Sequence, residues 1–140
     1  MSNTITSDIV YQLINVGDPS LSPDGVRVAF AKSSIDHESM ETVSHVMMMD
    51  VASGESSRFT NGDKDSGPRF SPDGKSLAFS RPDSKGRKQI WAIPTAGGEA
   101  LKLTDVPGGI TDVAWSPDSG SLAFASDVDP DLLPDDHDPK

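Results

Sequence analysis

The sequence predicts an all-β fold, a partial β-propeller of about two and a half four-stranded antiparallel blades preceded by a short N-terminal helix. The first observation is a motif that recurs in the 140 residues at 21–30, 70–79 and 115–124. The second is a match between residues 46–60 and 90–104, in register at a shift of 44 residues. A repeat of about 40–45 residues that divides into four short strands is typical of a propeller blade. The blades are therefore expected at 16–60, 66–104 and 110–126, the last one incomplete.

An N-terminal segment, residues 1–15, precedes the blades and is expected to hold a short helix over 7–15. Ser7 is a suitable N-cap, because its hydroxyl can accept a hydrogen bond from a free amide of the first helical turn. Gly17 and Pro19 follow and end the helical pattern. The apolar residues that share one helical stripe are Ile9, Val10, Leu13 and Ile14.

The second unit shows the four expected strands most clearly. Residues 66–70 lead into a turn, and 75–80 alternate so that Leu77 and Phe79 share one face. Residues 89–94 are apolar on both faces, as in a strand covered on both sides. Gly97 and Gly98 indicate a hairpin, and 100–104 alternate again. The same pattern predicts four strands in each of the first two units and two in the third. Since closed propellers need about 4–8 blades, the chain alone is expected to self-associate.

Each unit contains a Ser-Pro-Asp turn before its second strand. In the second unit Pro72 fixes φ, Asp73 tolerates the next turn position, and Gly74 supplies the positive φ that starts the return strand. In the third unit the order changes to Asp118, Ser119, Gly120. Either Ser119 takes the glycine conformation, or Gly120 shifts the turn by one residue.

The composition excludes several classes of function. The chain has no cysteine, which rules out disulfides and thiolate chemistry. Its net charge of −10 argues against nucleic acid or an anionic membrane as a partner. No apolar run approaches the roughly 18 residues of a membrane span, and residues 1–13 have no signal-peptide pattern, so a cytoplasmic location is expected. Residues 127–140 are acidic and rich in proline, and are expected to form a loop or tail.

The repeated motifs resemble the WD40-like propeller repeats of the TolB type: Ser-Pro-Asp-Gly at 71–74, Leu-Ala-Phe at 77–79, Ile-Trp-Ala-Ile-Pro at 90–94 and Gly-Gly-Glu-Ala-Leu-Lys-Leu-Thr at 97–104. The same repeats build the N-terminal propeller of prolyl oligopeptidase-family serine peptidases, including acylaminoacyl peptidases. Residues 8–25 are similar to the opening segment of many of those peptidases.

The resemblance implies a non-catalytic propeller portion that gates and positions peptides for a C-terminal α/β-hydrolase domain. That domain carries the family's catalytic residues, and no position here matches them, since the chain contains no Gly-x-Ser-x-Gly elbow. The implied partners are the hydrolase domain and the remaining blades, with peptide substrates engaged indirectly. The alternative is a TolB-like module that acts by binding proteins. A propeller enzyme such as a lactonase is disfavoured, because no cluster of metal ligands is recognisable. No catalytic, cofactor-binding or metal residues are therefore expected.

Two groups of residues were weighed as sites of chemistry. The histidines are His37, His45 and His137, and they are expected at the surface because no nucleophile motif accompanies them. Asp127 begins an acidic run similar to a calcium loop. That run has Leu132 where the loop requires glycine, so an acidic linker is favoured.

Three further groups have structural interpretations. Residues 47–49 are all methionine and align with 91–93 on a buried strand, so they are expected to fill the core. The recurrent aspartates are expected to serve their turns; they are Asp24, Asp73 and Asp118. A local basic cluster is expected to form a solvated loop; it consists of Arg81, Lys85, Arg87 and Lys88.

Overall fold

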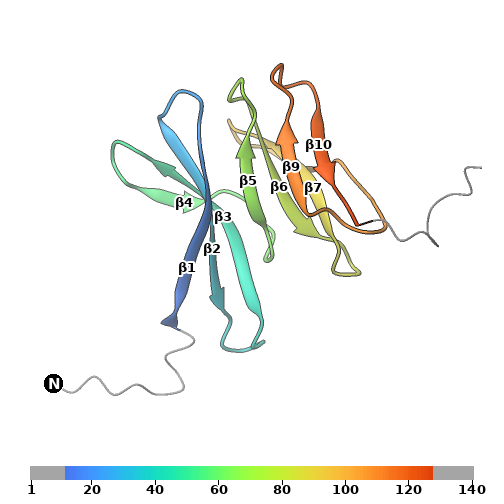
Figure 1. Ribbon diagram of the computed structural model, residues 1–140. Coiled ribbons are helices and arrows are strands. Elements are labelled where there is room, and N and C mark those ends of the chain that lie inside the picture. Colours follow the sequence, from blue (N-terminus) through green and yellow to red (C-terminus); the bar gives the residue numbers. More distant parts are fainter. Residues whose placement is uncertain (1–11, 128–140) are drawn as a thin grey trace, which may run out of the picture.

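The computed structural model describes residues 12–127. Ten strands in this range form three antiparallel sheets, which stand side by side in Figure 1. Strand order follows chain order in each sheet, β1-β2-β3-β4, then β5-β6-β7-β8, then β9-β10. The strands are β1 (Ile14–Leu21), β2 (Arg27–Ile35), β3 (Thr42–Asp50), β4 (Ser56–Arg58), β5 (Ser66–Phe70), β6 (Ser76–Pro82), β7 (Lys88–Pro94), β8 (Leu101–Lys102), β9 (Asp112–Trp115) and β10 (Leu122–Ala125).

The all-β, partial-propeller prediction is confirmed, with four, four and two strands in the three sheets. The predicted N-terminal helix is not supported. Its residues 7–11 lie outside the described range, Ile14 and Asn15 belong to β1, and no α-helix occurs in residues 12–127. The physical reason is pairing: Ile14 and Asn15 are bonded in antiparallel register to Ser34 and Ser33 of β2. A sheet ladder therefore replaces the helical bonds that the apolar stripe suggested.

The sheets stack with a bulky face against a face centred on alanine. We call the side of each sheet that carries Val28, Leu77 or Leu122 its large face, and the opposite side its small face. In the second sheet the large face includes Phe70, Leu77 and Phe79, which pack in one buried cluster against the small face of the first. That small face presents Ala29, Val46 and Met48, which are at most 8% exposed.

The same packing recurs at the second interface. Ala78 and Ile90 form the buried small face of the second sheet, and Trp115 and Leu122 pack on it from the large face of the third. The inner strand β5 contacts β1, β2 and β3 of the first sheet and β9 of the third. The alternation of large and small residues read in the sequence thus determines how neighbouring sheets fit together.

The Ser-Pro-Asp turns are held by the same hydrogen bonds in all three sheets. In the second, Ser71 Oγ donates to Asp73 Oδ1 at 2.6 Å, and the Lys75 amide donates to the same oxygen at 2.9 Å. These bonds, that of Ser71 first, lower the pKa of Asp73 below its usual value. The structural interpretation of the recurrent aspartates is therefore supported. In the third turn Ser119 adopts φ +62°, so it takes the glycine conformation.

Candidate functional site

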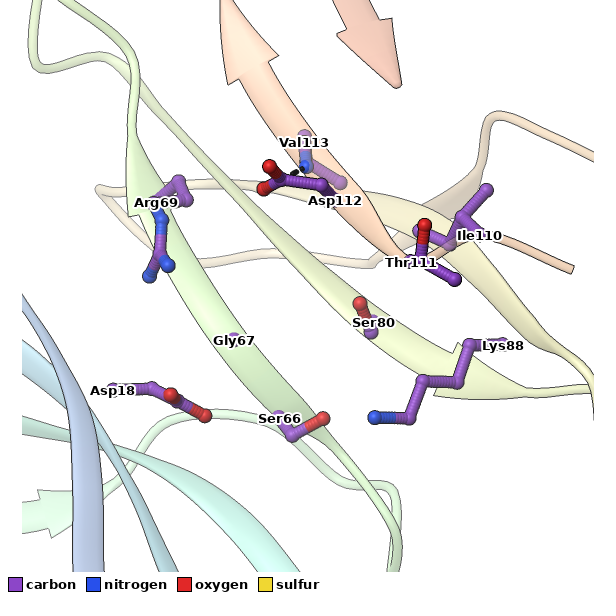
Figure 2. A pocket seen from close by; sticks show the side chains of 10 residues that line it. All are labelled: Asp18, Ser66, Gly67, Arg69, Ser80, Lys88, Ile110, Thr111, Asp112 and Val113. Atoms are coloured by element: carbon purple, nitrogen blue, oxygen red, sulfur yellow. Dashed lines mark hydrogen bonds between the residues drawn. The ribbon is translucent and has the colours of Figure 1, made fainter. Parts of the chain in front are cut away.

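The candidate site is a polar pocket of about 190 Å³ where the inner strands of the three sheets approach one another (Figure 2). Asp18 comes from β1, residues 66–69 from β5 and residues 110–113 from β9 and the segment before it. Ser80 on β6 and Lys88 at the start of β7 complete the lining. The pocket therefore combines carboxylate, guanidinium, ammonium and hydroxyl groups within one small cavity.

Three lining residues occupy equivalent positions of the repeat. These are Asp18, Gly67 and Asp112, one on each inner strand. In the first two sheets the position has positive φ, 51° at Asp18 and 61° at Gly67, and each lies where the register of the inner strand shifts. Aspartate tolerates this conformation better than most side chains, and glycine adopts it without strain. The irregularity therefore turns the same position of two inner strands toward one pocket.

The charged side chains of the pocket retain hydrogen-bonding capacity. Arg69 uses Nη1 to donate to the Pro68 carbonyl at 2.8 Å, and its own carbonyl accepts from Trp115 Nε1 at 3.0 Å. Asp112 Oδ1 accepts from the Val113 amide at 2.9 Å. Figure 2 shows Asp18 and Asp112 on different sides of β5, with Arg69 and Lys88 also around the cavity. The pocket thus offers both donors and acceptors to a ligand that carries both.

The pocket has hydroxyl groups and no histidine beside them. Ser66, Ser80 and Thr111 line it, whereas His37 is exposed between β2 and β3. His45 lies on β3, where its Nδ1 is 2.9 Å from the Gly62 carbonyl. The third histidine, His137, lies outside the described residues. The arrangement within 12–127 therefore binds polar groups and lacks the hydroxyl–imidazole pair of nucleophilic catalysis.

The methionines and the acidic run have simpler placements. Met48 is 8% exposed in the first core cluster, and Met47 and Met49 are half-buried on the opposite face of β3. Core filling therefore holds for Met48 and partly for its neighbours. Among residues 12–127 no group of three or more acidic or histidine side chains could hold a metal ion. Most of the acidic run that begins at Asp127 lies outside the described residues.

The basic cluster is less solvated than the sequence suggested. Lys85 and Lys88 are exposed, as expected. Arg87 forms an ion pair with Asp83 at 3.0 Å. Arg81 belongs to a buried network, in which its Nε and Nη2 donate to Asp65 at 2.7 and 2.9 Å. The expectation of a solvated loop is therefore wrong for Arg81.

The Asp65–Arg81 pair is the strongest polar feature that the sequence analysis missed. Asp65 is fully buried and also accepts a bond from the Gly62 amide at 2.9 Å. The Arg81 guanidinium lies 4.5 Å from the Trp91 ring centroid. Arg81 aligns with Lys32 and Ser126 in the other units, so reasoning from repeats has no signal for this pair. It clamps the connection between β4 and β5 onto the second sheet.

Comparisons with known proteins agree with this architecture. The model of the TolB beta propeller domain family, PD40, matches residues 7–131. The uncharacterized peptidase YuxL of Bacillus subtilis is 39% identical over 123 residues, which cover 87% of this chain and 19% of that protein. The Tol-Pal system protein TolB of Nitratidesulfovibrio vulgaris is 33% identical over 49 residues, 35% of this chain and 11% of that protein.

A solved structure resembles the same fold. The acylaminoacyl peptidase of Pyrococcus horikoshii superposes with a TM-score of 0.73 at 25% identity, covering 93% of this chain and 21% of that chain. The chain thus spans about a fifth of the length of this peptidase and of the Bacillus relative. Within residues 12–127 there is no helix long and apolar enough to cross a membrane.

Proposed function

Because the chain belongs to the PD40 family of TolB beta propeller domains, we propose that it is the non-catalytic N-terminal portion of a serine peptidase propeller of the prolyl oligopeptidase family. Its role is to admit peptides and to position them for a C-terminal α/β-hydrolase domain. The similarity to a peptidase over 87% of this chain supports the parentage. The cytoplasmic location expected from the sequence stays a prediction, which cell fractionation tests.

The pocket on the inner strands is the observation that carries the positioning role. A peptide offers an amide donor and a carbonyl acceptor at each residue, together with charged termini. Asp18 and Asp112 can accept from amide or ammonium groups, and Arg69 and Lys88 can donate to carbonyl or carboxylate oxygens. A pocket with both kinds of group favours an extended peptide over an apolar ligand.

The second candidate is a TolB-like module that binds other proteins. It is favoured by one observation, the 33% identity to a TolB protein over 49 residues. The coding sequence that follows Lys140 discriminates the two. Further blades and then a Gly-x-Ser-x-Gly elbow support the peptidase, whereas further blades without a hydrolase domain support the binding module.

Two assays of the purified chain test the proposal. In the first, peptide and ester chromogenic substrates should show no turnover, and turnover that a serine-directed inhibitor abolishes would contradict the non-catalytic role. In the second, binding of fluorescein-labelled peptides is followed by fluorescence anisotropy. Arg69→Ala and Asp112→Asn should each weaken binding by about tenfold, the loss expected for one hydrogen bond to a charged group.

Lys75→Ala is the matched control for the binding assay, because Lys75 is exposed in the turn between β5 and β6 and does not line the pocket. This variant should bind the peptides as the wild type does. Binding that neither Arg69→Ala nor Asp112→Asn weakens would remove the pocket from the proposed role.

A further inference from the structure

The two end sheets of the chain present complementary faces. Each of the two internal interfaces joins a large face to the small face of the preceding sheet. The large face of the first sheet and the small face of the third have no such neighbour within the described residues. We propose that these two faces form a head-to-tail interface with a second copy of this chain.

Equivalent residues show what the end faces lack. On the small faces, Ala29 and Ala78 are 0% and 1% exposed, whereas their equivalent in the third sheet, Ala123, is exposed. On the large faces, Phe70 is 8% exposed and its equivalent in the first sheet, Leu21, is 60% exposed. Same position and similar chemistry thus give burial inside the stack and exposure at its ends.

The large face of the first sheet is built to be covered. The antiparallel register places Leu21 beside Val28, Val28 beside Met49, and Phe30 beside Met47. Cross-strand partners share a face of the sheet, so these five apolar side chains lie together on one side. An apolar group of this kind on a sheet face is typical of an interaction surface.

The small face of the third sheet matches it in shape and charge. A shallow hollow of about 200 Å³ lies over β9 and β10, and the alanines at 114, 123 and 125 line it. Asp112 borders the same hollow, and Lys32 lies on the large face of the first sheet, so the two surfaces do not repel one another at these positions.

The internal interfaces indicate how a second copy would dock. At the first of them the inner strand β5 supplies contacts to β1, β2 and β3 of the preceding sheet. By the same geometry, β1 of the second copy would lie over β9 and β10 of the first. Two copies supply twice the three sheets of one chain, which lies within the roughly 4–8 blades of closed propellers. A second copy can therefore cover both end faces at once.

Sedimentation velocity over a concentration series tests the interface. The wild type should associate as its concentration rises. Leu21→Glu and Ala123→Glu should each weaken association by at least about 100-fold, because either one buries an unpaired carboxylate in the interface. Both sites are exposed within one chain, so the monomer should fold in each variant. Val51→Glu, in the turn between β3 and β4 and 48% exposed, is the control and should associate as the wild type does.

Mixing the two variants tests the head-to-tail geometry. Leu21→Glu keeps an intact small face and Ala123→Glu an intact large face, so their mixture should form heterodimers although neither variant associates alone. If the mixture stays monomeric while the wild type associates, the interface is not head-to-tail. A wild type that is monomeric at every concentration overturns the proposal and leaves both faces to further blades of a longer chain.

Discussion

Replacing Arg81 with methionine would leave the carboxylate of Asp65 buried without its cation. The side chain of Asp65 is 0% exposed and that of Arg81 is 22% exposed. Of the three hydrogen bonds that Asp65 accepts, two come from Arg81 and one from the Gly62 amide. Methionine keeps much of the side-chain volume, so the variant mainly removes charge and hydrogen bonds.

The expected loss is large compared with the stability of a small domain. Removing one partner of a buried ion pair typically costs about 3–5 kcal/mol, because the remaining charge is uncompensated. The cation–π contact with Trp91 adds about 0.5–1 kcal/mol. Since domains of this size unfold with a free energy of about 5–15 kcal/mol, Arg81→Met should remove a substantial part of the total.

Urea unfolding followed by circular dichroism measures the effect, at a protein concentration below that of any association. Lys102→Met is the control, because Lys102 forms an ion pair with Asp105 at 3.2 Å whose partners are 36% and 76% exposed. Its cost should stay below about 1 kcal/mol. The double variant Asp65→Leu with Arg81→Met should be more stable than Arg81→Met alone, because it also removes the buried charge. An Arg81→Met chain within about 1 kcal/mol of the wild type would refute this reasoning.

Three further predictions concern pH, backbone conformation and metal. Burial raises the pKa of Asp83, but hydrogen bonds from the Arg87 and Lys85 amides and the Arg87 guanidinium outweigh it and lower the pKa from 3.8 to about 2. The carboxylate should thus stabilise the fold above about pH 4 and lose that contribution as the pH falls toward 2, and Asp83→Asn should flatten acid unfolding over this window. Met40→Gly should raise stability by about 0.5–1 kcal/mol in urea melts, because Met40 has φ +59° and glycine relieves more strain than its added unfolded-state entropy costs. Calcium should not raise the melting temperature relative to chelator, and a rise of several degrees that Asp127→Asn abolishes would contradict this.

The repeat made the strands predictable, because it compares each unit with another of the same chain. The shift of 44 residues placed 89–94 opposite 45–50, and both segments are third strands of their sheets. The N-terminal segment has no copy elsewhere, so only local spacing was available there. That spacing suggested a helix where Ile14 pairs with Ser34 of β2. Pairing across the sheet overrode a weak local preference.

The candidate site was harder to predict than the fold. Asp18 and Asp112 are far apart in sequence, and each could be read as a turn or strand-end residue until three inner strands brought them to one pocket. Their equivalent positions in the repeat are the signal that could have found them. Asp65 and Arg81 gave no such signal, since an ion pair that occurs in one unit leaves no periodic trace.

The stacking of large faces on small faces also bears on how the chain folds during synthesis. Every sheet is a meander, so its strands pair with sequence neighbours and can form as soon as they emerge from the ribosome. The large face of each later sheet packs on the small face of the sheet made before it. Val46 and Ala29 are thus in place before Leu77 is synthesised. Folding can therefore proceed from the N-terminus with each new sheet docking on a surface that already exists.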